Sequence, residues 1–108
     1  MDKKGIREEV IKIAGKLKRR NRLQKVILFG SFARGDFGKY SDVDIIAVSG
    51  RFKGIRKLKR SPILYYDIHN NLNLKFDVDI VCYTPKEFEK LKGKSTFIKE
   101  AIEEGIEV

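Results

Sequence analysis

The feature that most constrains this chain is a glycine–serine pair, Gly30-Ser31, placed between an apolar run and two aspartates, Asp42 and Asp44. The apolar run, residues 26–29, is typical of a buried strand, and glycine lets the backbone approach a ligand closely where the strand ends. Asp42 and Asp44 open a second apolar run. On a strand, side chains two residues apart point to the same face, so both carboxylates are expected to aim at one point.

Two carboxylates side by side repel each other, and the arrangement is costly unless a cation joins them. Hard oxygen ligands of this kind suit Mg²⁺. A third acid lies in residues 75–83, which alternate and then become apolar, as in a strand. Alternation does not choose between Asp77 and Asp79, but Asp79 lies deeper in the apolar run and is preferred. If this strand neighbours the Asp42 strand, a three-carboxylate cluster for two metal ions results.

Composition restricts the class of protein. A chain of 108 residues is expected to form one domain, residues 1–108. Its single cysteine, Cys82, lies in a strand run and is interpreted as a core residue, which favours a reducing cytoplasm. No apolar run is long enough for a membrane span, and the N-terminus lacks a signal-peptide pattern. The high charged fraction, 36%, favours a thermophilic source.

The positive charge is uneven. Residues 1–60 contain 18 basic and 6 acidic side chains, whereas the rest of the chain is slightly acidic. A positive field favours nucleoside triphosphates, nucleic acid or an acidic protein partner, although lysines also simply solubilise a surface. The basic connection, residues 50–60, fits contact with triphosphate, RNA or an acidic partner. An exposed flexible loop is the favoured interpretation.

The remaining elements follow from periodicity and capping signals. Ser61-Pro62 is interpreted as an N-cap and first helical residue, and Thr84 with Glu87 as a capping box. The expected helices are 4–20, 31–36, 61–70, 85–93 and 95–105, and the expected strands are 26–29, 41–49, 75–83 and 106–108. Two inward faces of the 61–70 helix stay open: one with Ile63, Tyr66 and Asn70, and one with Leu64 and Ile68.

The order of a strand, Gly30-Ser31, ten residues, Asp42-x-Asp44 and a later Asp79 resembles the DNA polymerase β-type nucleotidyltransferase superfamily. It is most similar to the small prokaryotic minimal (MNT) nucleotidyltransferases, and the motifs span residues 26–87. The resemblance implies an α+β, α/β-like fold, in which a small mixed β-sheet carries helices mainly on one face.

The resemblance also implies roles for individual residues. Gly30 and Ser31 would hold the triphosphate of ATP, and Asp42 and Asp44 would bind two Mg²⁺ ions. Asp79 would bind one of these ions and help to activate the acceptor hydroxyl.

Arg34 is a further candidate for contact with phosphate oxygens, because a guanidinium group binds them in pairs. The alternative for Arg34 is a surface ion pair with Asp36. No sequence signal decides between these two roles.

The expected function is transfer of AMP from ATP to a hydroxyl of a partner protein. In the family, MNT proteins often pair with a HEPN-type toxin, for which they act as antitoxins. Two alternatives stay open: a binding subunit that neutralises its partner by contact alone, and a nucleic-acid-binding subunit that uses the basic half. The nucleotide base, the acceptor and a homo-oligomeric state are not determined by the sequence.

Overall fold

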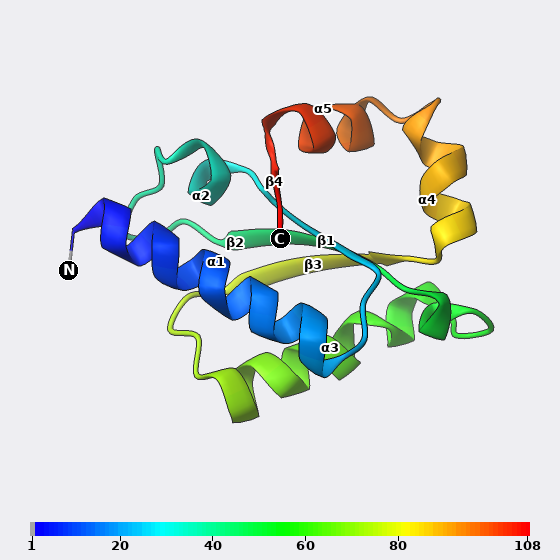
Figure 1. Ribbon diagram of the computed structural model, residues 1–108, viewed down its shortest axis with the longest axis horizontal. Helices are drawn as coiled ribbons and strands as arrows, with labels where there is room; N and C mark the ends of the chain where they lie inside the picture. Colours follow the sequence, from blue (N-terminus) through cyan, green and yellow to red (C-terminus); the bar gives the residue numbers. More distant parts are fainter. Residues whose placement is uncertain (1) are drawn as a thin grey trace.

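The computed structural model describes residues 2–108, and a mixed four-stranded sheet lies at its centre (Figure 1). The strands are β1 (Lys25–Phe29), β2 (Val43–Val48), β3 (Val78–Tyr83) and β4 (Ile106–Glu107), and their order across the sheet is β3-β2-β1-β4. The central strand β1 is antiparallel to both β2 and β4, whereas β2 and β3 are parallel. The crossover between the two parallel strands contains a helix, as this connection usually requires.

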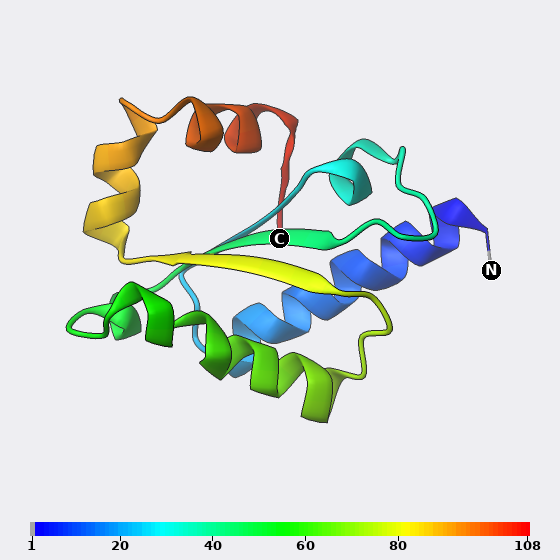
Figure 2. The ribbon, with the colours of Figure 1, turned by 180° about the vertical axis from the view of Figure 1, so that it is seen from behind.

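Helices lie on both faces of the sheet. They are α1 (Lys3–Arg20), α2 (Ser31–Arg34), α3 (Ser61–Asp67), α4 (Pro85–Lys92) and α5 (Thr96–Glu104), with short turns η1 (Gly50–Phe52), η2 (Lys57–Lys59) and η3 (Ile68–Leu72). Both ribbon views place α1 and α3 on one side of the strands and α4 and α5 on the other (Figure 2). Among residues 2–108, no helix combines the length and the apolar character that a membrane crossing requires.

Strand alternation divides the apolar side chains between two cores. On β2, Val43 and Ile45 enter the larger core, which α1, α2 and α3 cover, whereas Ile46 enters the smaller core under α4 and α5. The mixed sheet, with the greater part of its helical cover on one face, confirms the expected fold class. Cys82 is buried in the larger core, where burial raises the pKa of its thiol to about 12. It is a core residue, as predicted.

The α3 region differs from its prediction at both ends. Ser61 is the first helical residue and Arg60 precedes it, so the assignment of Ser61 as N-cap is wrong by one residue. Leu64 and Ile68 are buried, which decides the inward face. The helix then continues into the π-helical turn η3 and ends at Asn73, whose φ of 54° is left-handed. The third strand begins at Val78, three residues later than expected.

Arg60 is buried, although the sequence favoured an exposed loop for residues 50–60. Its guanidinium group donates to the carbonyl oxygens of Ile55 and Cys82 and to both carboxylate oxygens of Glu87. Glu87 also completes the predicted capping box with Thr84. The hydrogen bonds from Arg60 are the main cause that lowers the pKa of Glu87 to about 2. This interaction fixes the end of the basic segment against α4.

Asp67 joins the end of α1 to α3. Arg20 donates two hydrogen bonds to its carboxylate, at 2.8 and 3.1 Å to Oδ1, and a third to Oδ2. Asn21 and Asn71 donate to the same carboxylate. The Arg20 hydrogen bonds are the main cause that lowers the pKa of Asp67 to about 2. The carboxylate therefore stabilises the contact between two elements that are distant in the sequence.

The lowered pKa of Asp67 predicts that the free energy of unfolding falls at low pH. The carboxylate contributes its full stabilisation above its ordinary pKa of 3.8 and loses it as the pH falls towards 2. Asp67→Asn should lower the free energy of unfolding by about 1.5–3 kcal/mol at pH 7. It should also flatten the pH dependence between pH 4 and pH 2. Urea denaturation across this range measures both effects, with the exposed Glu100→Gln as control; equal pH curves for wild type and Asp67→Asn would contradict the assignment.

Candidate active site

The turn between β1 and α2 lies directly against Asp44. Gly30 has φ of 74° and ψ of −154°, a conformation that essentially only glycine adopts. A Cβ atom at this position would collide with the Asp44 carboxylate and lie 3.2 Å from its Cγ. Glycine is therefore required twice, by the backbone angle and by the close approach of the carboxylate.

Asp44 and Asp79 are direct partners across the parallel strands β2 and β3. On its other side, Asp44 pairs with Phe29 of β1. Asp42 immediately precedes β2 and is exposed, as is Asp79, whereas Asp44 is half-buried. The three acids thus lie at the same end of the sheet, on the face that α4 and α5 share.

Burial is the main cause that raises the pKa of Asp44, and the nearby carboxylates of Asp79 and Asp42 raise it further. The Arg34 guanidinium opposes this shift. Asp44 is therefore the acid at which desolvation and repulsion from like charges combine. A cation placed among these three carboxylates would relieve both costs.

The structure also separates the two acids that alternation left undecided. Asp77 precedes β3, and its backbone carbonyl accepts a hydrogen bond from Val43 N. Asp79, and not Asp77, stands opposite Asp44 and contributes to its raised pKa. This arrangement agrees with the preference for Asp79, whose role as third metal ligand stays a prediction.

The carboxylate side chains do not meet at a single point. Within residues 2–108, no group of three His, Cys, Asp or Glu side chains stands ready to hold a metal ion. Mutual repulsion favours rotamers that keep like charges apart. The donor set nevertheless fits Mg²⁺, because it consists only of carboxylate oxygens. Asp42 and Asp44 are two residues apart, and Asp79 stands opposite Asp44 on the neighbouring strand.

Ser31 and Arg34 occupy the first and last residues of α2. Ser31 is half-buried, next to Gly30. Arg34 is exposed and forms ion pairs with Asp36 at 3.2 Å and Glu104 at 3.6 Å. The ion pair with Asp36 is the alternative that the sequence left open. Contact between Arg34 and a phosphate stays a prediction.

Arg7 is a residue that the sequence did not single out. From α1, it donates to the carbonyl oxygens of Phe32 at 3.1 Å and Ala33 at 2.7 Å. It thereby fixes α2, and with it the Gly30 turn, against the long first helix. No local pattern indicates this contact, because the partners lie 25 residues apart and the acceptors are backbone atoms.

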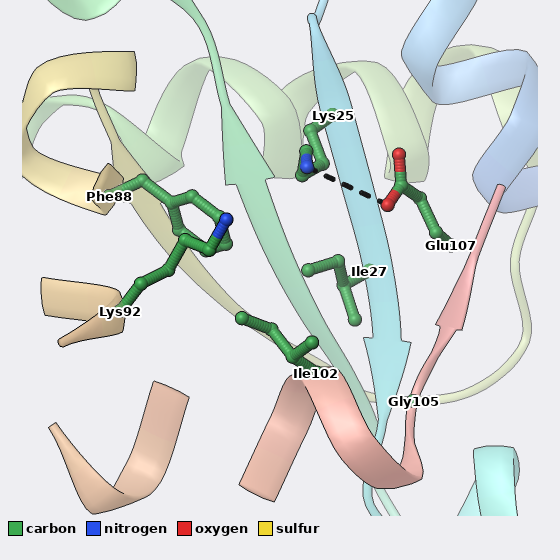
Figure 3. Close-up of a pocket in the computed structure, with 7 residues that line it drawn as sticks. All are labelled: Lys25, Ile27, Phe88, Lys92, Ile102, Gly105 and Glu107. Carbon is green, nitrogen blue, oxygen red and sulfur yellow. Dashed lines mark ion pairs between the residues drawn. The ribbon is translucent and has the colours of Figure 1, made fainter. Parts of the chain in front are cut away.

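Two hollows lie near these elements. One, of about 360 Å³, is bordered by Lys3, Lys4, Arg7, Arg34, Gly35 and Phe37. The other, of about 110 Å³, lies between α4, α5, β1 and β4 and is bordered by Lys25, Ile27, Phe88, Lys92, Ile102, Gly105 and Glu107 (Figure 3). The first is strongly cationic and includes one predicted site residue. The second contains none of the predicted site residues, and its Lys25 is paired with Glu107 at 3.7 Å.

Comparison with known proteins agrees with this geometry. Residues 10–72 match the family model described as the nucleotidyltransferase domain. This chain belongs to the nucleotidyltransferase family. A Methanocaldococcus jannaschii protein named "Putative protein adenylyltransferase MJ0141" is 31% identical over 106 residues, which cover 93% of this chain and 99% of the relative. Another from that organism, "Putative protein adenylyltransferase MJ0604", is 49% identical over 47 residues, 44% of this chain and 45% of the relative.

Solved structures share the nucleotidyltransferase fold. The crystal structure of a putative nucleotidyltransferase from Sulfolobus solfataricus matches with a TM-score of 0.60 at 20% identity, over 97% of this chain and 80% of that chain. A toxin–antitoxin crystallised with AMP-PNP matches with a TM-score of 0.55 at 25% identity, over 94% of this chain and 70% of that chain.

The tight fit at Gly30 gives a first test of the geometry of this candidate site. Gly30→Ala should lower the free energy of unfolding by about 2–4 kcal/mol, because it adds a collision with Asp44 to a strained backbone. Gly35 provides a matched control, since it also has a positive φ, of 90°, but has open space around it. Gly35→Ala should cost only about 1–2 kcal/mol. Equal losses for both variants in urea denaturation would contradict the close approach of Asp44.

The raised pKa of Asp44 gives a second test. Because the folded state disfavours the charged carboxylate, Asp44→Asn should stabilise the protein at pH 7 in the presence of a metal chelator. The gain should shrink as the pH falls towards the ordinary value of 3.8 and be largely lost below it, where the wild-type carboxyl is neutral in both the folded and the unfolded state. Thermal denaturation measures the effect, with the exposed Glu103→Gln as control. A loss of stability in Asp44→Asn would show that the carboxylate is not under repulsion.

Proposed function

We propose that this nucleotidyltransferase transfers AMP from ATP to a hydroxyl group of a partner protein, which we infer to be a HEPN-type toxin. The observation that carries the proposal is the register of β2 and β3, which sets Asp79 beside Asp44, the residue that lies against the Gly30 turn. A phosphate-binding turn beside paired carboxylates is the arrangement that nucleotidyl transfer requires.

Each residue has a defined part in this proposal. Gly30 and Ser31 hold the triphosphate through backbone N–H groups and a hydroxyl. Asp42, Asp44 and Asp79 would hold two Mg²⁺ ions, which when bound would offset the charge of the phosphates and lower the pKa of the acceptor hydroxyl. Asp79 accepts the proton of that hydroxyl. The acceptor oxygen then forms a bond to the α-phosphorus, the bond from this phosphorus to the bridging oxygen breaks, and pyrophosphate leaves.

A protein acceptor is supported by the relatives. The two Methanocaldococcus jannaschii proteins carry the name protein adenylyltransferase, and the toxin–antitoxin neighbour was crystallised with an ATP analogue. A cytoplasmic location, expected from the single buried Cys82, belongs to the same proposal.

The reaction is tested with ATP labelled at the α-phosphate and a purified HEPN-type protein as the acceptor. The wild type should transfer label to that protein in the presence of Mg²⁺, and removal of the metal by a chelator should stop the transfer. Asp79→Asn should reduce the rate by roughly 100-fold or more, because it removes a metal ligand and the base together.

Asp77→Asn is the matched control, since Asp77 lies two residues from Asp79 and does not stand opposite Asp44. Its rate should stay within a few fold of the wild type. Absence of label on the partner, or equal labelling by Asp42→Asn/Asp44→Asn, would overturn the enzymatic proposal. If this double variant still neutralised the partner's toxicity, the protein would act by contact alone.

A further inference from the structure

A second surface lies at the opposite end of β2 and β3 from the carboxylates. The segment that follows β2 and the beginning of α4 lie at the same end of the sheet, where β3 ends (Figures 1 and 2). Six cationic side chains from these two elements form what we call the basic platform: Lys53, Arg56, Lys57, Lys59, Lys86 and Lys90. Three of them, Lys53, Lys86 and Lys90, border a hollow of about 340 Å³, together with Gly54, Arg60, Thr84 and Glu87.

The charge of this platform is not neutralised within the described chain. All six side chains are exposed, and none has an ion-pair partner among residues 2–108. The acid in the hollow, Glu87, is already paired with the buried Arg60 at 2.6 Å. Clustered like charges destabilise a folded chain through their repulsion, and an anionic partner would relieve that cost.

The platform is also held in a fixed shape. Arg60 joins the segment to the end of β3 and to α4, through Cys82 O and Glu87. Ser49 accepts a hydrogen bond from Arg51 N and so caps η1, and Phe52 is buried beneath the segment, 3% exposed. A surface that is ordered before binding loses less conformational entropy when a partner docks.

An apolar side chain lies next to two of these charges. Leu58 is 86% exposed and lies between Lys57 and Lys59 on η2. The aromatic residues nearby, Phe52 and Tyr83, are buried, and none of the platform residues is aromatic. Single-stranded nucleic acid is bound largely by stacking of bases on exposed aromatic rings. A protruding leucine with a cationic rim instead matches a protein surface that has an apolar hollow and acidic surroundings.

We propose that the basic platform docks an acidic protein surface, with Leu58 as its apolar anchor, and that the docked protein is the acceptor of the transfer reaction. This inference rests on the proposed function. The four residues of β2 that follow Asp44 separate it from the platform segment by about 15 Å. Docking and chemistry are therefore assigned to different ends of the same pair of strands.

The test measures binding of the purified HEPN-type partner in the absence of ATP, by titration calorimetry at two salt concentrations. The charge reversal Lys57→Glu/Lys59→Glu should raise the dissociation constant by about tenfold or more, and Leu58→Ala should raise it by a similar factor. The control Lys12→Glu/Lys16→Glu reverses two exposed lysines on α1 and should leave the affinity within about twofold, as expected outside an interface. Thermal melts verify that each variant is folded.

Each outcome decides the question. No binding by the wild type, or equal affinity for Lys57→Glu/Lys59→Glu and the α1 control, would overturn the proposal. Binding of a 20-nucleotide RNA that is lost in Lys57→Glu/Lys59→Glu, with protein binding retained, would assign the platform to nucleic acid and also overturn it. Because the titrations contain no ATP, docking can succeed when label transfer fails, and transfer can succeed when the platform variants keep full affinity.

Discussion

The parallel pairing of β2 with β3 is the interaction on which the site depends. It sets Asp44 against Asp79 in register, while the antiparallel partner β1 delivers Gly30 to the same end of the sheet. The pairing forces like charges together, so it places an electrostatic cost at this end that only a cation or protonation relieves. Apolar residues on the opposite face of β2, such as Val43 and Ile45, are buried in the larger core, and their burial offsets this electrostatic cost.

Polar interactions at the periphery fix the parts that hydrophobic packing alone leaves undetermined. Arg60 with Glu87 fastens the basic segment to α4, and Arg20 with Asp67 fastens α1 to α3. Arg7 holds α2 through two backbone carbonyls. In each case an arginine reaches an acceptor from a distant element, which suits a guanidinium group with several donors in a rigid plane. The two ends of β2 and β3 differ in charge: the end with Asp42, Asp44 and Asp79 is anionic, and the end with the basic platform is cationic.

Features with a local cause could be predicted from the sequence. The Thr84–Glu87 capping box requires only four consecutive residues, and it is present as expected. The buried stripe of α1, with Val10, Ala14 and Leu17, follows from helical periodicity. The strand that ends at the Gly30 turn could be predicted because an apolar run stops abruptly at a glycine. Helix boundaries were predicted less exactly. Ser61 is the first residue of α3 and not its N-cap, and Arg60 before it forms an ion pair with Glu87.

The sequence by itself determined most of the local elements and the residue types of the site, because periodicity, capping and motif spacing act over a few neighbouring residues. The kind of fold followed from the resemblance of the motifs to a known superfamily. Only the tertiary structure decided that Asp79 rather than Asp77 stands opposite Asp44, since strand register depends on how two separate segments pair. It also decided that Arg60 is buried while the lysines around it stay exposed. Alternation and composition do not contain that information, because Glu87, the carboxylate that compensates the buried charge of Arg60, lies 27 residues away in the sequence.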